Sequence, residues 1–221
     1  MKLSKTLEEI RKYTERNFEL TKSHHFLFNL PLEKNTETAD IIVIGLNPGE
    51  HSNDWNLSKV LTEETNEYDF HHELGNGRLS LSWSKKCIEY LPSKNIYQSE
   101  FFFWSSSNID KHFFQRFGYT FKNCPHFQFC KKCNLDMINF HKPKLIVSAG
   151  TSYANLFASI YKMKHINTIK SEADKRKRRV IIHYEFESIP FIFTPHWSSG
   201  YISNEEKGEI ICGIIFDPIK D

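Results

Sequence analysis

Residues 41–49 read Ile-Ile-Val-Ile-Gly-Leu-Asn-Pro-Gly. The first four are β-branched and apolar, a run that is typical of a central strand buried on both faces. The Gly, Asn and Pro residues that follow predict a turn where this strand ends. Because ligands bind at the carboxyl ends of strands in open α/β sheets, this turn is a candidate binding site.

Apolar patterns along the rest of the chain predict strands that alternate with helices. We expect further strands at 96–104, 145–147, 180–182 and 191–193, the last two around a turn at Pro190. We expect helices in the first twenty residues, at 54–64 and 77–91, near 135–138 with an end before Pro143, after a cap at Thr151, and after the Ser-x-x-Glu capping box at 203–206. This alternation predicts an α/β fold with a largely parallel sheet.

Length and composition favour one domain in a reducing compartment. A chain of 221 residues suffices for one hydrophobic core, so we expect a single domain over 1–221, with a helical extension at 1–37 and a loop-rich, Cys-containing insertion at 105–133. The odd count of five cysteines, and a start that lacks the apolar centre of an export signal, predict free thiols in the cytoplasm. No apolar run is long enough to cross a membrane, and we expect a monomer.

A second turn rich in polar groups follows the last predicted strand. Residues 194–200 read Thr-Pro-His-Trp-Ser-Ser-Gly. Each turn alone is a weak signal, since a lone histidine is more often structural than catalytic. Their pairing, one near the first strand and one near the last, is more specific because parallel strands end at the same sheet edge.

These motifs resemble those of the uracil-DNA glycosylase superfamily. Residues 45–49 are similar to its first motif, in the Asn form of the mismatch-specific branch, and residues 196–199 are similar to its second motif, normally His-Pro-Ser-Pro. Two further stretches, 75–79 and 142–150, are similar to the Gly-Arg-Leu segment and a Pro-Lys-x-Ile-Val-x-x-Gly strand of thermophile-type members. The resemblance implies a three-layer α/β/α sandwich with a central, mainly parallel four-stranded sheet.

The resemblance also implies a function. It predicts a monofunctional DNA glycosylase that hydrolyses the N-glycosidic bond of uracil or a modified pyrimidine, for base-excision repair or for defence against phage with modified DNA. Asn47 would hold the attacking water with help from Glu50, and His196 would donate a hydrogen bond to O2 of the departing base. Neither motif contains a lysine that could form a Schiff base, so strand cleavage is not expected.

The expected base pocket departs from the superfamily at one position and differs from uracil-strict relatives at another. Glu100 stands where an Asn usually reads the base, with Asn108 as a later candidate, and a carboxylate can only accept hydrogen bonds, as from the amine of a cytosine-like base. Gly49 leaves open the space that a bulky Tyr fills in uracil-strict relatives. The expected pocket residues are Gly45, Leu46, Pro48, Gly49, Phe70, His72, Glu100 and Asn108.

DNA contacts are expected from the second motif and from a basic segment. Residues 170–179 hold six basic and two acidic residues, a local charge of +4 within a chain whose net charge is +2. Such a run is usually a solvated loop, but beside a DNA groove it would neutralise phosphates. The expected DNA-binding residues are Trp197, Ser198, Ser199, Tyr201, Arg176 and Arg178.

The cysteines admit two interpretations. Cys124, Cys130 and Cys133, with His126 between them, have spacing that suits a structural zinc site, and an iron–sulfur cluster that includes Cys87 is a weaker alternative. Free thiols in a Phe-rich region are the other interpretation. The expected chemistry requires no cofactor.

Two rival functions remain open from the sequence. One is a catalytically weak superfamily member that binds DNA or a protein partner. The other is a nucleotide-processing α/β enzyme that uses residues 45–49, although these lack the Lys and the glycine spacing of a phosphate-binding loop.

Overall fold

The computed structural model describes residues 3–23, 30–31, 38–47, 89–93, 95–106, 108–171, 180–197 and 202–216. Its strands are β1 (Leu30–Pro31), β2 (Ile41–Gly45), β3 (Ile96–Glu100), β4 (Leu145–Ala149), β5 (Lys164–Lys170), β6 (Val180–Phe186) and β7 (Ile189–Thr194). Its α-helices are α1 (Leu3–Arg16), α5 (Phe113–Phe117), α6 (Phe127–His141), α7 (Ala154–Tyr161) and α8 (Asn204–Phe216). Two 3₁₀ helices are η1 (Phe18–Lys22) and η2 (Phe121–Asn123).

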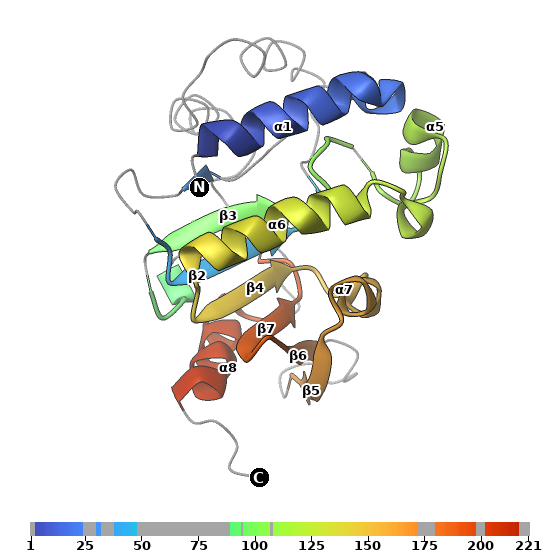
Figure 1. The fold of residues 1–221 in the computed structure, drawn as a ribbon. Helices are drawn as coiled ribbons and strands as arrows, with labels where there is room; N and C mark the ends of the chain where they lie inside the picture. The colour runs from blue at the N-terminus through green and yellow to red at the C-terminus, as the bar shows by residue number, and fades with distance from the viewer. Residues whose placement is uncertain are drawn as a thin grey trace.

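The described strands form one mixed sheet of seven, in the order β1-β3-β2-β4-β7-β6-β5 (Figure 1). The pairs β3–β2, β2–β4 and β4–β7 are parallel. The pairs β1–β3, β7–β6 and β6–β5 are antiparallel. The predicted α/β class is confirmed, and the sheet is larger and more mixed than predicted because antiparallel strands extend both sides of the parallel strands.

Both faces of the sheet are covered, which explains the continuous apolar run of β2. Ile42 and Ile44 belong to a large aromatic cluster with buried residues of α6 and α7, while Ile41 and Val43 belong to a second cluster with Ile211 of α8. Alternate residues of a strand point to opposite faces, so a strand between two helical layers is apolar at every position. Helix α6 crosses the front of the sheet in Figure 1.

Two strand predictions need correction. The strand expected at 96–104 ends at Glu100, and the four aromatic residues after it are buried away from the regular ladder. The hairpin between β6 and β7 turns at Glu187 and Ser188, whose φ angles are 48° and 67°, and Pro190 lies within β7. Two positive φ angles match the twist of a tight hairpin, which is why the turn forms here without glycine.

The helices begin and end partly as predicted. Helix α6 ends at His141, before Pro143, and Ser203 Oγ accepts a hydrogen bond from the Glu206 N–H at 3.0 Å, so both expectations are confirmed. The cap expected at Thr151 is displaced: the N-cap residue of α7 is Tyr153, and the helix begins at Ala154, whose N–H bonds the Thr151 carbonyl. Helix α6 begins inside the expected loop-rich insertion. Apart from residues 89–91, the helices expected at 54–64 and 77–91 lie outside the described residues.

No helix among the described residues is both long enough and apolar enough to span a membrane.

Candidate functional site

The carboxyl ends of four parallel strands meet at one edge of the sheet, on the right in Figure 1. The register pairs Gly45 with Glu100, Ile44 with Ser148, and Ala149 with Thr194. Strand β3, which comes next after β2 in the chain, pairs with one side of β2. Strand β4, which comes after β3, pairs with the other side, so the direction in which strands are added to the sheet reverses at β2. A reversal of this kind opens a crevice outside the strand ends. With about 4.8 Å between neighbours, the ends of β2 and β7 are about 10 Å apart.

The first-motif turn is fixed by the segment that follows β3. The carbonyls of Gly45 and Leu46 accept hydrogen bonds from the N–H groups of Phe101 and Phe102, at 2.9 and 3.0 Å. The half-buried Asn47 donates through Nδ2 to the Ser106 carbonyl at 3.3 Å. This places Asn47 at the carboxyl end of β2, with its amide oriented by a hydrogen bond.

Glu100 lies directly against Gly45. Its side chain is 4% exposed, and a Cβ atom built on Gly45 would collide with its carboxylate. Glycine at this position leaves room for a buried acidic side chain beside the first motif. Gly45 and Glu100, two predicted pocket residues that are far apart in the sequence, are neighbours in the structure.

A residue that sequence analysis missed holds this end of β3. Asn134 of α6 is 1% exposed and donates through Nδ2 to the Glu100 carbonyl at 3.0 Å. Its Oδ1 accepts from Ser99 Oγ at 2.6 Å, and Nδ2 also bonds Tyr161 Oη at 3.1 Å. Buried amides normally have specific partners, and the amide of Asn134 bonds Ser99, Glu100 and Tyr161.

Asn108 has a different role from the one considered. It is exposed, and its Oδ1 accepts hydrogen bonds from the N–H groups of Asp110 and Lys111 at 3.0 and 2.8 Å. These bonds make Asn108 the cap of a turn before α5. Of the two candidates, Glu100 is the one adjacent to the first motif.

The second motif follows β7 and divides its side chains between solvent and core. His196 is exposed, whereas Trp197 is 1% exposed and packs in the α8-side cluster with Ile202. Trp197 was predicted to contact DNA, and the structure instead buries it among apolar residues that include Ile202 and, in α8, Ile211. Its role here is packing.

The surroundings of His196 favour the neutral form of its ring. Partial desolvation of the ring, followed by the positive charge of Lys207, lowers its pKa below the ordinary value for histidine. A neutral imidazole can donate one hydrogen bond and accept another. This protonation state suits a donor toward a developing negative charge.

The remaining predicted site residues lie outside the described residues. They are Pro48, Gly49, Glu50, Phe70, His72, Arg176, Arg178, Ser198, Ser199 and Tyr201. The two ends of the basic segment are described: Lys170 pairs with Val180 at the same sheet edge as the β7 terminus, and Ser171 Oγ bonds Glu206 Oε1 of α8 at 2.7 Å.

The structure does not group the predicted metal ligands, Cys124, Cys130, Cys133 and His126, around one point. His126 uses both ring nitrogens in hydrogen bonds at 2.9 Å, from Nδ1 to Tyr13 Oη and from Nε2 to Glu19 Oε1. Burial raises the pKa of Cys124 and of Cys133 to about 12, and that of Cys130 well above its usual range. Across the described parts of the chain, no three His, Cys, Asp or Glu side chains are grouped to hold a metal ion. Cys87 lies outside them.

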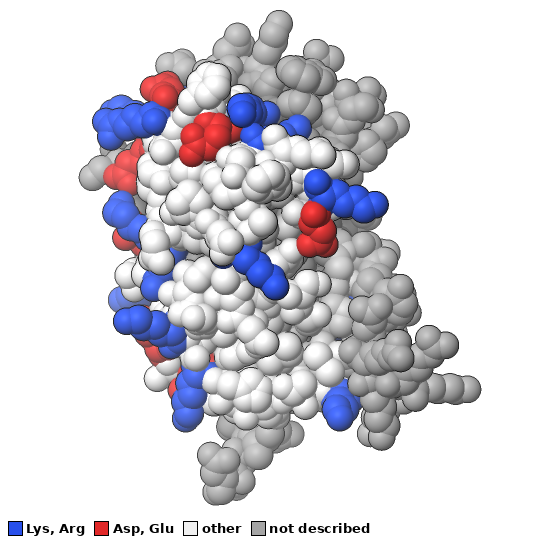
Figure 2. Space-filling model, turned by 90° about the vertical axis from the view of Figure 1, so that its right-hand side faces the viewer, with Lys and Arg blue, Asp and Glu red and all other residues white. Residues whose placement is uncertain are grey.

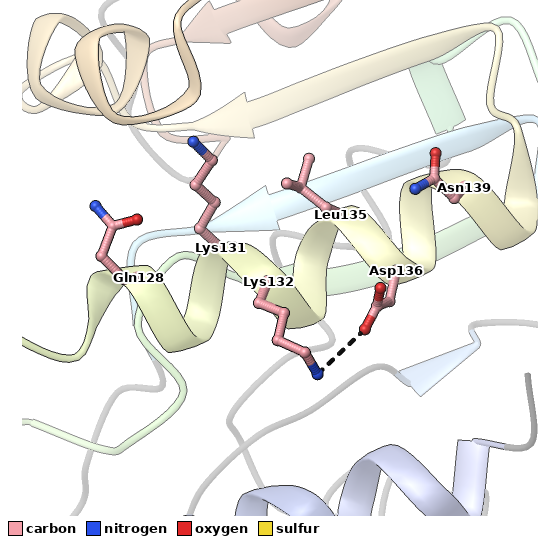
Figure 3. Close-up of a pocket in the computed structure, with 6 residues that line it drawn as sticks. All are labelled: Gln128, Lys131, Lys132, Leu135, Asp136 and Asn139. Atoms are coloured by element: carbon pink, nitrogen blue, oxygen red, sulfur yellow. Dashed lines mark ion pairs between the residues drawn. The ribbon is translucent and has the colours of Figure 1, made fainter.

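One surface hollow is formed along α6. It has a volume of about 390 Å³ and is lined by Gln128, Lys131, Lys132, Leu135, Asp136 and Asn139. All six come from α6, and Figure 3 shows Lys132 and Asp136 pointing to one side of the helix and the other four to the opposite side. Side chains that diverge from one helix do not converge on a ligand, so this hollow is not a candidate active site.

Charge is sparse on the described face at the carboxyl ends. Figure 2 views the molecule from this side, and most of the described surface there is uncharged. The Lys and Arg residues in this view lie mainly along one margin, next to Asp and Glu. The described surface therefore offers no continuous basic patch at this edge, and phosphate binding there would depend on the 170–179 segment.

Comparisons with known proteins assign no function. No model of a protein family matches the chain, and no curated protein matches it. A functional assignment therefore depends on the motifs and on the geometry of the sheet edge.

Proposed function

We propose that the chain is a monofunctional DNA glycosylase of the uracil-DNA glycosylase type. The observation that carries the proposal is the convergence at one sheet edge. The Asn47 turn leaves the strand at which the winding reverses, Glu100 ends the neighbouring strand, and the His196 turn follows a strand two positions away. Motifs near opposite ends of the sequence share this edge only because the four strands are parallel.

The chemistry follows from these groups. Breaking an N-glycosidic bond leaves positive charge on the sugar and negative charge on the departing base. Asn47 positions water through its amide, and Glu50 is the nearest carboxylate in sequence that could assist by accepting a proton. The neutral His196 imidazole donates to O2 as charge develops there, which lowers the barrier electrostatically.

Glu100 favours a base with an exocyclic amine. Its carboxylate is buried beside the first motif, where it accepts from an N–H donor and repels a carbonyl oxygen such as O4 of uracil. Modified cytosines are thus better substrates than uracil in this proposal, and a glycine at position 49 adds no side chain that would exclude a 5-substituent. Defence against modified phage DNA then fits better than general repair.

The finer architecture and the location belong to the same proposal. Four parallel strands with α6 and α7 on one face and α8 on the other support a three-layer α/β/α sandwich. We infer a monomer that acts on DNA in the cytoplasm without a required cofactor. The anchoring of the basic segment at Lys170 and Val180 supports contact with phosphates near the site.

The test is an assay with oligonucleotides that contain U, T opposite G, hydroxymethyl-C or glucosylated C, followed by alkali. Wild type is expected to leave abasic sites, fastest with a modified cytosine. Asn47→Ala and His196→Ala are expected to lower the rate by about 10² or more. Asn139→Ala on the outer face of α6 is the matched control and should retain wild-type rates.

Each outcome decides between the functions. Tight DNA binding with no abasic product would replace the proposal with the DNA-binding rival. Neither binding nor product would favour a nucleotide-processing enzyme. Cleavage of U alone would keep the glycosylase but reject the role given to Glu100.

A further inference from the structure

A buried lysine lies behind the second motif, and the proposed chemistry does not use it. Lys207 of α8 is fully buried. Its Nζ donates to the backbone carbonyl of His196 at 3.1 Å and to Asn204 Oδ1 at 3.1 Å. The same Nζ atom lies 5.4 Å from the centre of the Trp197 ring.

Burying an ammonium group is costly, so its partners show what the charge does. Two of these three interactions are with consecutive residues of the second motif, His196 and Trp197. An apolar side chain of similar volume would fill the same space without the desolvation cost. Lys207 also lies near the N-terminal end of α8, where a positive charge is disfavoured by the helix dipole. Packing alone therefore does not account for a lysine here.

We propose that Lys207 is a positioning residue for His196. Its ammonium group holds the His196 carbonyl and the Trp197 ring, and so fixes the turn that carries the exposed imidazole. The catalytic part of this role rests on the proposed function of His196 as the donor to O2. The structural part, which is the coupling of Lys207 to His196, does not.

The charges around the turn support an electrostatic contribution. Strands β4 and β7 contain no charged residue, and α8 carries Glu205, Glu206 and Glu209 beside Lys207. The carboxylate of Glu206 accepts from Ser171 Oγ. Lys207 is the charged group that adds to desolvation in lowering the pKa of His196. The lysine thus both holds the turn and favours the neutral imidazole.

The first experiment is an NMR titration of His196 in the full-length protein without DNA. Lys207→Met removes the charge, Lys207→Gln keeps a donor without charge, and Lys207→Arg keeps the charge. Loss of the charge is expected to raise the pKa of His196 by about half a unit or more, while Arg leaves it near the wild-type value. A folded Met or Gln variant with an unchanged His196 titration overturns the coupling. If the Met variant does not fold, the Gln variant gives the same answer.

The second experiment separates positioning from general stability. In the otherwise wild-type protein, Lys207→Met is expected to lower kcat about tenfold with little change in KM. The acidic limb of the pH–rate profile is expected to move to higher pH, because the pKa of His196 rises. In a His196→Ala background, the same change should lower kcat less than about twofold, because the residue acts through His196. Equal losses in both backgrounds would overturn positioning. If no substrate is cleaved by wild type, the proposed function fails, and the NMR titration still decides the coupling.

Discussion

At the scale of single residues, His141 is the clearest case of burial controlling chemistry. The ring is 7% exposed, and its Nδ1 accepts the Ala39 N–H at 3.0 Å. Burial lowers the pKa of His141 to about 4. Protonation at Nδ1 would both charge a buried ring and remove the acceptor, so the neutral form is strongly preferred in the folded state.

This predicts a pH-dependent stability. The folded pKa lies below the unfolded value of about 6.5, so the contribution of His141 is complete above pH 6.5 and is lost as pH falls toward 4, by up to about 3 kcal/mol. Urea unfolding between pH 7 and 4 measures the loss, and NMR measures the pKa directly. His141→Asn keeps an acceptor that does not titrate, so its stability should fall less over this range. Parallel pH curves for the two proteins would rule the effect out.

Gly45 supports a second prediction at this scale. An added Cβ meets the buried Glu100 carboxylate, so Gly45→Ala is expected to cost about 1–3 kcal/mol in the free energy of unfolding. Glu100→Ala removes the obstructing group. In the double variant the two losses should be less than additive, which a double-mutant cycle with urea unfolding measures. Full additivity would show that the two side chains do not meet.

At the scale of elements, α1 and η1 are held to the start of α6 by one buried histidine. His126 bonds Tyr13 of α1 and Glu19 of η1, and the Tyr13 ring stacks on Phe129 with centroids 3.7 Å apart. Tyr13→Phe keeps the stacking but leaves Nδ1 of His126 without this donor. We expect a loss of about 1–2 kcal/mol and faster proteolysis within α1. Phe18→Ala, at a side chain that is 77% exposed, is the control and should change stability by less than about 0.5 kcal/mol.

Elements with strong local patterns were predictable, and those fixed by tertiary contacts were not. The apolar runs of β2 and β4 and the Ser203 cap are local signals, and all three elements form. Strand β5 is mostly exposed, with only Asn167 and Ile169 half-buried, so few buried apolar residues mark it as a strand in the sequence. Its position depends on pairing with β6, which no local pattern encodes.

In the candidate site, too, residues with a local signal in the sequence were predictable and residues positioned by tertiary packing were not. The turn residues Asn47 and His196 were identifiable because they follow predicted strands. Lys207 and Asn134 were not, since a lysine or an asparagine on a helix ordinarily faces solvent. Only the packing of α8 and α6 against the strand ends buries them.

At the scale of the whole molecule, the net charge of +2 conceals an uneven distribution. The basic segment joins β5 to β6, and its described ends lie at the edge where Asn47, Glu100 and His196 are found. The amino ends of β4 and β5, which carry Lys144 and Lys164, lie at the opposite edge. If DNA binds at the carboxyl edge, its affinity should fall when basic residues near that edge are neutralised, and not when the same charge is removed from the opposite edge.

This gives a prediction with a charge-matched control. Arg176→Gln/Arg178→Gln is expected to weaken DNA binding and to reduce the slope of log K against log salt by up to about 2, because each arginine would neutralise one phosphate. Lys144→Gln/Lys164→Gln removes the same charge from the opposite edge, and its slope should stay near wild type. Fluorescence anisotropy over 50–200 mM salt measures the slopes of both variants. Across this range, about six phosphate contacts already change the affinity strongly. Equal slopes in the two variants would mean that DNA responds to net charge alone, and the segment would then be a solvated loop.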